Sequence, residues 1–473
     1  MRLLRGAVLG AALLALPGCT SFVDGMRTSA SPSGSGSGGS GGCPTERAAP
    51  DPHRPVIRYD FRLADDPKAV TGTETVTFTP DLDTDKLVFR LLPNSPVSAR
   101  AGNVLTVDGA RGGDVARASY VPDGAAGPGG LYEVALQAPL GAGHSTTVAL
   151  DFTLILGEGT FDRFGTAAGL SWWGSGAPLL AWEPGVGWAE DPFPGLLGET
   201  ASSTVADTRI SVSVPETLTV LMTGNQDQPS APQDGRRTWT SAEPVARDVS
   251  VVVGPFTTAQ RTTPDGVSVT VGVLPHSDLG VEQLADWTTA SIADLEKRFG
   301  PFPYRTLTVP LLPAYGGGIE YPSSIQLAAS DRDVLLHEVA HMYFYGMVGD
   351  SQFRDPWLDE AFATYAESVD HPPPDAAVQR ALHQPGDVGA AIAGFANDDQ
   401  YFGIVYGKGG AALLAARQAA GADPFDAAIR CYVDANAWTI ATPADVAAAL
   451  ADLPAALQVL LDAGALQQDD LSA

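Results

Sequence analysis

Two histidines four residues apart, with one glutamate between them and another downstream, most constrain how this chain can fold. His337 and His341 flank Glu338, and Glu360 follows His341 after eighteen intervening residues. Residues four apart in a helix lie on one face, so the two imidazoles project together. Two imidazoles and one carboxylate are the ligand set of a catalytic zinc ion, which keeps its fourth position for water. The pattern therefore predicts two helices that meet around one zinc ion per chain.

The residues around the expected ligands favour the same interpretation. Glu338 directly follows the first histidine, where a carboxylate can take a proton from a water on the zinc ion. Glu360 lies on the apolar side of an expected helix that begins at Asp355-Pro356, where an unpaired carboxylate would be costly. Glu367, two turns further along, is either an acceptor for a ligand imidazole or an exposed helix carboxylate.

The N-terminus has the pattern of a secretion signal rather than of a folded element. Arg2 and Arg5 precede an apolar run over residues 7–16 that is too short to span a bilayer permanently. Small residues then precede Cys19, as in the lipobox of bacterial lipoproteins. The alternative is an ordinary secretory signal in which Cys19 is incidental. We expect residues 1–18 to be a lipoprotein signal peptide and Cys19 to anchor the protein by a lipid to the extracytoplasmic side of the cell membrane.

The rest of the first half is expected to be a tether followed by strands. Residues 19–44 are rich in Ser and Gly, which favours a flexible tether. Residues 45–258 contain short runs of alternating polarity, such as 70–78 and 210–214, that Gly and Pro separate. This pattern predicts an all-β domain without helices. Four tryptophans between residues 172 and 188 either pack in its core, which we favour, or line a substrate cleft.

The character of the chain changes near residue 259. An expected helix over 281–299 lies between two strand patterns, and a helical region follows. Ser330 and Asp333 predict a capping box at the start of the histidine helix. We expect residues 259–473 to form the zinc-binding catalytic domain. The fold class is therefore multidomain α and β.

Composition excludes some functions and leaves other questions open. The net charge of −27, from 28 basic and 55 acidic residues, argues against a nucleic-acid partner and favours solubility. None of the three cysteines has metal-site spacing. Outside the cytoplasm, Cys43 and Cys431 could form a disulfide, or they could remain two unpaired thiols. The sequence does not indicate an oligomeric state.

The histidine helix and the Trp-Leu-Asp-Glu-Ala-Phe-Ala-Thr-Tyr run at 357–365 resemble the zinc site of the aminopeptidase N-like gluzincins, a family of zinc metallopeptidases. The run Gly317-Gly318-Ile319-Glu320-Tyr321 resembles that family's Gly-x-Met-Glu-Asn motif, with Ile319 and Tyr321 as departures. By this resemblance Glu320 binds the free α-amine of a peptide substrate, and Gly317 and Gly318 lie along its backbone. A carboxylate at the end of a cleft suits that role because it anchors an ammonium group.

A second motif carries the resemblance further. Tyr406-Gly407-Lys408-Gly409 is similar to the family's Tyr-x-Lys-Gly segment, in which the tyrosine donates a hydrogen bond to the oxyanion. The resemblance therefore implies that Tyr406 is the oxyanion donor. Tyr401, five residues earlier, is a candidate for substrate binding on weaker grounds.

The resemblance covers about residues 55–473. It implies an N-terminal saddle-like all-β domain followed by a thermolysin-like α/β catalytic domain with C-terminal helices. The glutamine that the family's β domain usually places at the amine site is not found, and we expect the family's large C-terminal helical domain to be missing. We expect a zinc-dependent aminopeptidase that releases N-terminal residues from peptides outside the cytoplasm. The alternatives are a zinc endopeptidase with an open cleft and a non-catalytic peptide-binding lipoprotein.

Overall fold

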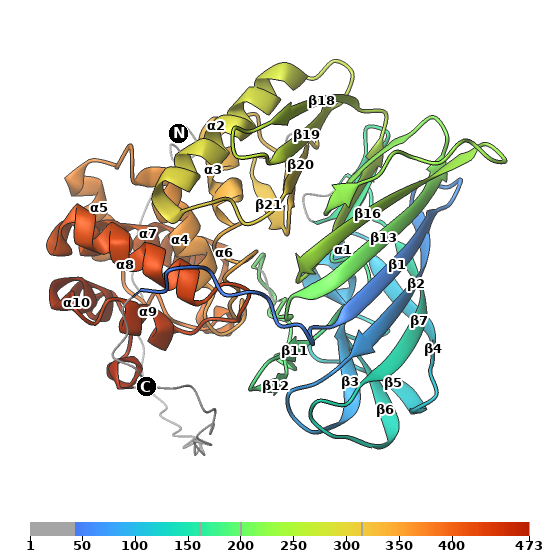
Figure 1. Cartoon of the computed structure of the whole chain (residues 1–473), viewed down its shortest axis with the longest axis horizontal. Coiled ribbons are helices and arrows are strands. Elements are labelled where there is room, and N and C mark those ends of the chain that lie inside the picture. The colour runs from blue at the N-terminus through green and yellow to red at the C-terminus, as the bar shows by residue number, and fades with distance from the viewer. Residues whose placement is uncertain (1–42, 160–162, 199–200, 314–315, 473) are drawn as a thin grey trace, which may run out of the picture. The chain divides into compact units, whose positions relative to one another are not determined.

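Strands make up most of the first half of the chain, and helices make up most of the second half (Figure 1). The structure, a computed structural model, describes residues 43–159, 163–198, 201–313 and 316–472. The mixed α and β class agrees with the class expected from the sequence. Cys19 and the proposed signal peptide lie outside the described residues.

The largest sheet joins segments that are far apart in the sequence. In order across the sheet, its seven strands are β15 (Asn225–Gln226), β16 (Arg236–Ala246), β13 (Ala206–Pro215), β1 (Val56–Leu63), β2 (Ala69–Phe78), β7 (Thr146–Ile155) and β4 (Val104–Arg111). Figure 1 shows β16 to β4 side by side. β1 pairs in parallel with β13 and antiparallel with β2. Alternate residues of β1 are buried because successive side chains of a strand point to opposite faces. The runs expected to be strands at 70–78 and 210–214 fall within β2 and β13.

Smaller sheets complete the strand-rich half. One contains β10 (Leu179–Leu180), β3 (Thr84–Arg90), β6 (Leu131–Leu140) and β5 (Val115–Val121). Another contains β14 (Thr219–Met222), β17 (Ser250–Gly254), β9 (Leu170–Gly174) and β8 (Phe164–Ala167), and β11 (Trp182–Glu183) pairs with β12 (Gly187–Trp188). Trp172, Trp173 and Trp182 are buried, as the core interpretation predicts, and Trp188 packs on Trp182.

The expectation of strands without helices was wrong at one place. Residues 96–100 form a short helix, α1 (Pro96–Arg100), after a 3-10 turn at Leu92–Asn94. The Ser95 side chain accepts a hydrogen bond from the Ser98 backbone, and Pro96 supplies a φ angle that suits the first helical position. Five residues are too few to show the helical periodicity on which the sequence argument relied.

A second sheet supports the helical half. Its five strands, in order, are β18 (Thr257–Thr262), β19 (Ser268–Val273), β20 (Thr306–Pro310), β22 (Ser324–Leu327) and β21 (Gly318–Tyr321). The helix α2 (Val281–Phe299) joins the parallel strands β19 and β20 and has the bounds expected from the sequence. Leu284, Ile292 and Leu295 of α2 are buried because they form one apolar stripe. β21 lies at one edge of the sheet and pairs antiparallel with β22.

The helices that follow carry the motifs. They are α3 (Arg332–Ala340), α4 (Trp357–Ser368), α5 (Asp375–Leu382), α6 (Asp398–Tyr401), the π-helix η3 (Phe402–Lys408), α7 (Gly409–Ala420), α8 (Ala422–Ala435), α9 (Pro443–Ala449) and α10 (Pro454–Asp462). The capping box expected for α3 is not formed. Asp331, rather than Ser330, is the N-cap, and its carboxylate accepts the Asp333 N–H at 2.8 Å. Asp331 can do this because a short Asp side chain reaches the backbone two residues ahead.

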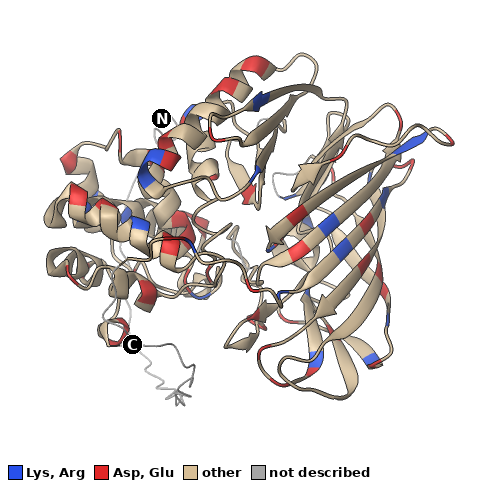
Figure 2. Cartoon of the chain, in the orientation of Figure 1, with Lys and Arg blue, Asp and Glu red and all other residues tan. Residues whose placement is uncertain are grey.

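Charge and hydropathy add two observations. Acidic residues are spread over both the helices and the strands (Figure 2). Within the residues that the structure describes, no helix combines the length and apolar character that crossing a membrane requires.

Candidate metal centre and peptide site

The two histidines come together at the end of α3. His337 lies in the last turn of the helix, and His341 is its C-cap with helical φ and ψ angles of −61° and −14°. The 3.6-residue period therefore still applies at His341, and both imidazoles lie on one face. Their ring centroids are 4.8 Å apart.

Glu360 completes the cluster from a second helix. α4 begins at Trp357, directly after its N-cap Pro356, and places the Glu360 carboxylate opposite α3. Glu360 Oε2 is 3.4 Å from His337 Nε2 and 3.5 Å from His341 Nε2. Two ligands held about 2.0–2.1 Å from a tetrahedral ion lie about 3.3–3.4 Å apart. The two distances from Glu360 Oε2 are therefore close to those within one ligand set, and all three atoms lie within 4.8 Å of one another.

The chemistry of the cluster also fits a cation. Glu360 is 4% exposed, and its Oε2 has no hydrogen-bond partner among the described residues. Burial alone would lower the pKa of His337, but the neighbouring Glu360 and Glu367 carboxylates outweigh burial and hold this pKa well above 6.5. The carboxylates that favour positive charge on the imidazole also favour a divalent cation, which neutral imidazoles can ligate. The three side chains can therefore hold a metal ion.

Each imidazole also has a partner on its far side. His337 Nδ1 is 3.4 Å from Glu367 Oε2, so the structure selects the ligand-facing alternative for Glu367 over the exposed one. His341 Nδ1 hydrogen-bonds to Asp359 Oδ1. Such outer partners fix the orientation of a ligand ring and raise its basicity.

Sequence reasoning missed Asp359 and the residue that holds it. Gln352 Nε2 donates to Asp359 Oδ2 at 3.2 Å, and Gln352 Oε1 accepts the backbone N–H of Ala201 at 2.9 Å. A chain of hydrogen bonds thus runs from the strand-rich half of the protein to His341. The sequence did offer a signal for Asp359, because this carboxylate directly precedes the expected ligand Glu360. The sequence holds no comparable signal for Gln352, because its partners are distant along the chain.

Two further carboxylates lie beside the histidines. Glu338 projects from α3 and Glu320 from β21, and they are 5% and 4% exposed. Oxygen atoms of Glu320 and Glu338 and a ring nitrogen of His341 lie within 4.8 Å of one another. A Cβ atom on Gly318 would lie 2.5 Å from Glu338 Cγ, so the missing side chain at 318 makes room for Glu338.

The motif glycines shape the strand that carries Glu320. Gly317 has a φ of 147°, which residues with side chains rarely adopt, and its carbonyl accepts the Ala328 N–H at 2.9 Å. Gly318 and Ile319 pair with Leu327 and Gln326 of β22. Because β21 is the last strand of its sheet, its other backbone edge has no neighbouring strand among the described residues.

Tyr406 reaches the centre from the π-helix. Its hydroxyl donates to Glu360 Oε1 at 2.5 Å, and its ring stacks on that of His337 with centroids 6.0 Å apart. The π-helix was not expected from the sequence, and such turns occur frequently at functional sites. Tyr401 is fully buried and packs against Phe395, Phe402 and Tyr406.

The remaining residues of the Tyr-Gly-Lys-Gly segment hold the π-helix in place. Lys408 Nζ donates to the Gly386 carbonyl at 2.6 Å. Gly409 and Gly410 let α7 approach α4 closely, since Cβ atoms there would lie 2.6 Å from Ala361 Cβ and 2.7 Å from Thr364 Cγ2. This close packing brings Tyr406 to Glu360.

Solved structures that resemble the chain include M1 zinc metallopeptidases. One from Deinococcus radiodurans has a TM-score of 0.67 at 19% identity, and the match covers 90% of this chain and 96% of that one. A mutant two-domain M1 zinc metallopeptidase bound to L-arginine gives 0.65 at 20% identity, with 89% and 95% covered. A Deinococcus radiodurans mutant bound to a Tyr-Ser-Ala substrate gives 0.64 at 19% identity, with 87% and 94% covered. The chain matches no protein-family model and no curated protein. The architecture described above is therefore the two-domain, aminopeptidase N-like fold of the M1 zinc metallopeptidases.

Proposed function

We propose that the protein is a zinc-dependent aminopeptidase that releases N-terminal residues from peptides. The observation that carries the proposal is the convergence of His337, His341 and Glu360 into one ligand set, with two buried carboxylates beside it. The similar structures that hold L-arginine or Tyr-Ser-Ala support a peptide substrate. His337 Nε2, His341 Nε2 and Glu360 Oε2 would be the ligands of one zinc ion.

Glu338 is assigned the proton transfers. When bound, zinc supplies Lewis acidity that polarises the scissile carbonyl and lowers the pKa of water at the site. Glu338 accepts the proton of the attacking water and later delivers it to the leaving amine. The position of Glu338 supports this role, because its carboxylate and His341 belong to one cluster.

Glu320 is assigned the recognition of the free N-terminus. In any peptide the α-nitrogen lies about 2.5 Å from the carbonyl carbon of the same residue. A carboxylate that binds the α-ammonium must therefore lie within a few ångströms of the base that serves that carbonyl. Glu320 meets this condition, since its oxygen is within 4.8 Å of the Glu338 carboxylate. The pairing restricts cleavage to the first peptide bond.

Tyr406 and β21 position the rest of the substrate. The Tyr406 hydroxyl, which donates to Glu360 in this structure, turns to donate to the oxyanion as it forms. Tyr401 supports the Tyr406 ring by packing against it. Gly317 and the outer edge of β21, which begins at Gly318, offer backbone groups to an extended peptide, which adds to the sheet as a further strand.

We also propose the location and the domain division that the sequence indicates. Cys19 carries the lipid, residues 19–44 form the tether, and the protein acts on the extracytoplasmic side of the cell membrane. Residues 45–258 form the β domain and 259–473 the catalytic domain. Two largely separate hydrophobic cores support this division, one drawn mainly from the strands before residue 258 and one mainly from later residues.

Hydrolysis of amino-acid anilides tests the function. The purified protein is assayed with free and N-acetylated anilides, with and without a zinc chelator, and with an internally quenched peptide whose N-terminus is acetylated. We expect cleavage of the free anilides alone and its loss on chelation. Cleavage of the blocked peptide would instead establish an endopeptidase. Zinc binding without cleavage of any substrate would leave a peptide-binding protein.

A further inference from the structure

The first described residues lie against the helices of the C-terminal half. Arg47 Nε forms an ion pair with Asp434 Oδ1 of α8 at 2.9 Å, and Arg47 Nη2 donates to the Phe299 carbonyl at 3.2 Å. The guanidinium also lies 5.9 Å from the Tyr343 ring centroid. The side chains of Arg47 and Asp434 are only 18% and 22% exposed, so this ion pair is shielded from water. These three contacts therefore fix the position of Arg47 against the helices.

The same contacts bring two cysteines together. Cys43 precedes Arg47 by four residues, and Cys431 precedes Asp434 by three, which places Cys431 and Asp434 on the same face of α8. The Cys431 thiol makes a hydrogen bond with the Cys43 thiol, and burial together with this contact raises the pKa of Cys431 to about 12. Cys43 is exposed, and Cys431 is half-buried.

We propose that Cys43 and Cys431 form a disulfide bond. The structure holds them as two free thiols, and the Cys431 thiol already contacts that of Cys43. A disulfide-containing oxidant accepts the electrons. The sulfur of exposed Cys43 attacks that disulfide and releases one thiol, and Cys431 then displaces the second. Overall two thiols become one disulfide, and two protons and two electrons pass to the oxidant, which leaves as two thiols.

The bond would fasten the end of the tether to the helices around the metal centre. α8 packs against α7, and α7 packs against α4, the helix of Glu360. The closed loop contains nearly all of the described chain, so the bond restricts the unfolded state strongly. It also keeps any pull on the proposed anchor from reaching the first strand, β1. Neither cysteine is among the residues of the candidate site, so the bond does not depend on the proposed peptidase activity. Only its effect on the anchor rests on the proposed location.

Peptide mapping tests the bond. The full chain carrying Cys19→Ser, which removes the third thiol, is incubated with oxidised glutathione, alkylated with iodoacetamide and digested without reductant. We expect a cross-linked peptide that joins Cys43 to Cys431, lighter than the sum of its parts by two hydrogens, and its disappearance after reduction. Cys43 and Cys431 both recovered as alkylated thiols, or each as a separate glutathione adduct, would overturn the proposal.

A measurement of the thermal midpoint tests whether the disulfide stabilises the folded protein. Reduction of the oxidised protein is expected to lower its thermal midpoint by roughly 5 °C, since a disulfide across a long loop stabilises strongly. Cys431→Ser should show the lower midpoint under both conditions and keep full anilide hydrolysis. A bonded protein whose midpoint does not change on reduction would contradict the fastening role.

Discussion

Gly318 shows how the absence of one side chain places the proposed base. A Cβ atom at 318 would lie 2.5 Å from Glu338 Cγ and 2.7 Å from Glu338 Oε1, closer than real Cβ atoms approach. The Glu338 carboxylate can occupy its position beside His341 only because residue 318 is glycine. This geometric condition is independent of any assumption about the substrate.

Gly318→Ala should therefore displace Glu338 without removing the metal ligands. We expect kcat/KM to fall by about 100-fold while zinc content is unchanged, because a shift of about 1 Å in a reacting group is that costly. Hydrolysis of a free anilide and metal analysis measure the two effects. Gly109→Ala is the matched control, since Gly109 also lies in an edge strand and a Cβ there would have no neighbour within 4 Å. Full activity in Gly318→Ala would remove Glu338 from its assigned role.

Gln352→Met should weaken zinc binding through Asp359 and His341. The methionine keeps the volume but cannot donate to Asp359 or accept from Ala201, so the carboxylate loses its orientation. We expect a loss in zinc affinity of about 10-fold or more, measured by competition with a fluorescent chelator. Gln458→Met is the control, because Gln458 donates to Asp462 on the surface. Equal affinities in the two variants would show that the hydrogen-bonded chain does not support the ligand.

The sequence was informative for residues whose partners lie near in the chain. His337, Glu338 and His341 share two helical turns, so their spacing alone predicts a common face. Glu360 needed one further assumption, that its helix packs against the first. Gln352 bonds to Ala201, which is far away in the sequence, and no local pattern could have revealed that contact.

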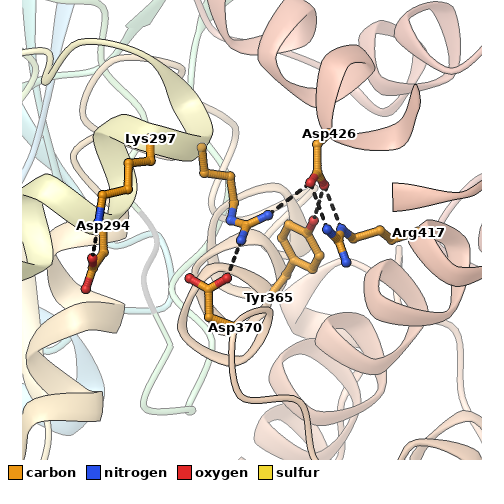
Figure 3. Close-up of polar contacts among 7 residues, drawn as sticks. Asp294, Lys297, Tyr365, Asp370, Arg417 and Asp426 are labelled. Atoms are coloured by element: carbon orange, nitrogen blue, oxygen red, sulfur yellow. Dashed lines mark hydrogen bonds and ion pairs between the residues drawn. The ribbon is translucent and has the colours of Figure 1, made fainter. Parts of the chain in front are cut away.

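Among the elements, α4 is held in place by an ionic network at its C-terminal end. Asp426 of α8 accepts hydrogen bonds from Arg417 of α7 at 2.7 and 2.8 Å and from the Tyr365 hydroxyl of α4 at 3.2 Å (Figure 3). Arg298 of α2 bonds to Asp426 at 3.1 Å and to Asp370, which follows α4, at 2.5 Å. One carboxylate thus links four helices, including the helix that carries Glu360.

The pKa of Asp426 gives this network a pH dependence. Burial raises the pKa, but Arg417 and Arg298 outweigh burial and hold it below 3.8. A depressed folded-state pKa adds stability that is complete above the unfolded value and is lost as the pH falls through the folded value. Asp426→Asn should therefore lower the thermal midpoint at pH 7, and its deficit should shrink below about pH 4. Asp452→Asn, at an exposed carboxylate, serves as the control. A deficit of constant size from pH 7 to pH 3 would argue against the network.

Long elements were predictable because their periodicity repeats. α2 spans 19 residues and β2 spans 10, enough for the 3.6-residue and two-residue patterns to stand out. The five-residue α1 and the π-helix left no such pattern, because one is too short and the other is a local widening of a helix. The cap of α3 differed by one residue, a shift of the kind that side-chain geometry decides.

Across the whole molecule, Arg247 joins the strand-rich half to the segment that follows α3. Its guanidinium donates to the carbonyls of Ser203 at 2.7 Å, Gly346 at 3.3 Å and Thr439 at 3.1 Å. Arg247 is 5% exposed, and Gly349 leaves room for it, since a Cβ there would lie 2.4 Å from the guanidinium. Three distant segments therefore meet on one planar cation.

Arg247→Lys should destabilise the fold although it keeps the charge. A lysine ammonium is a point donor and cannot reach three carbonyls around a planar fork. With one or two buried carbonyls left without a donor, we expect the free energy of unfolding to fall by about 2–4 kcal/mol. Denaturant unfolding measures this change, with Arg58→Lys, at an exposed arginine, as the control. A loss no larger than that of the control would show that Arg247 does not join the segments.

The arrangement of the strands in the sheets could not be predicted from the sequence. Alternation predicts which segments are strands, but it does not say that β1 pairs in parallel with β13 or that β10 pairs with β3. Those pairings depend on how complete sheets bury their faces. The fold class was predictable because strand patterns and helix patterns occupy different halves of the chain.

A single ion held by His337, His341 and Glu360 is central to the proposed activity. Anomalous diffraction at the zinc edge, from crystals of the chain grown with zinc, tests this directly. We predict one peak in bonding contact with His337 Nε2, His341 Nε2 and a Glu360 oxygen, at about 2.0–2.2 Å from each. No peak at this position, or a peak that other side chains hold, would contradict the account.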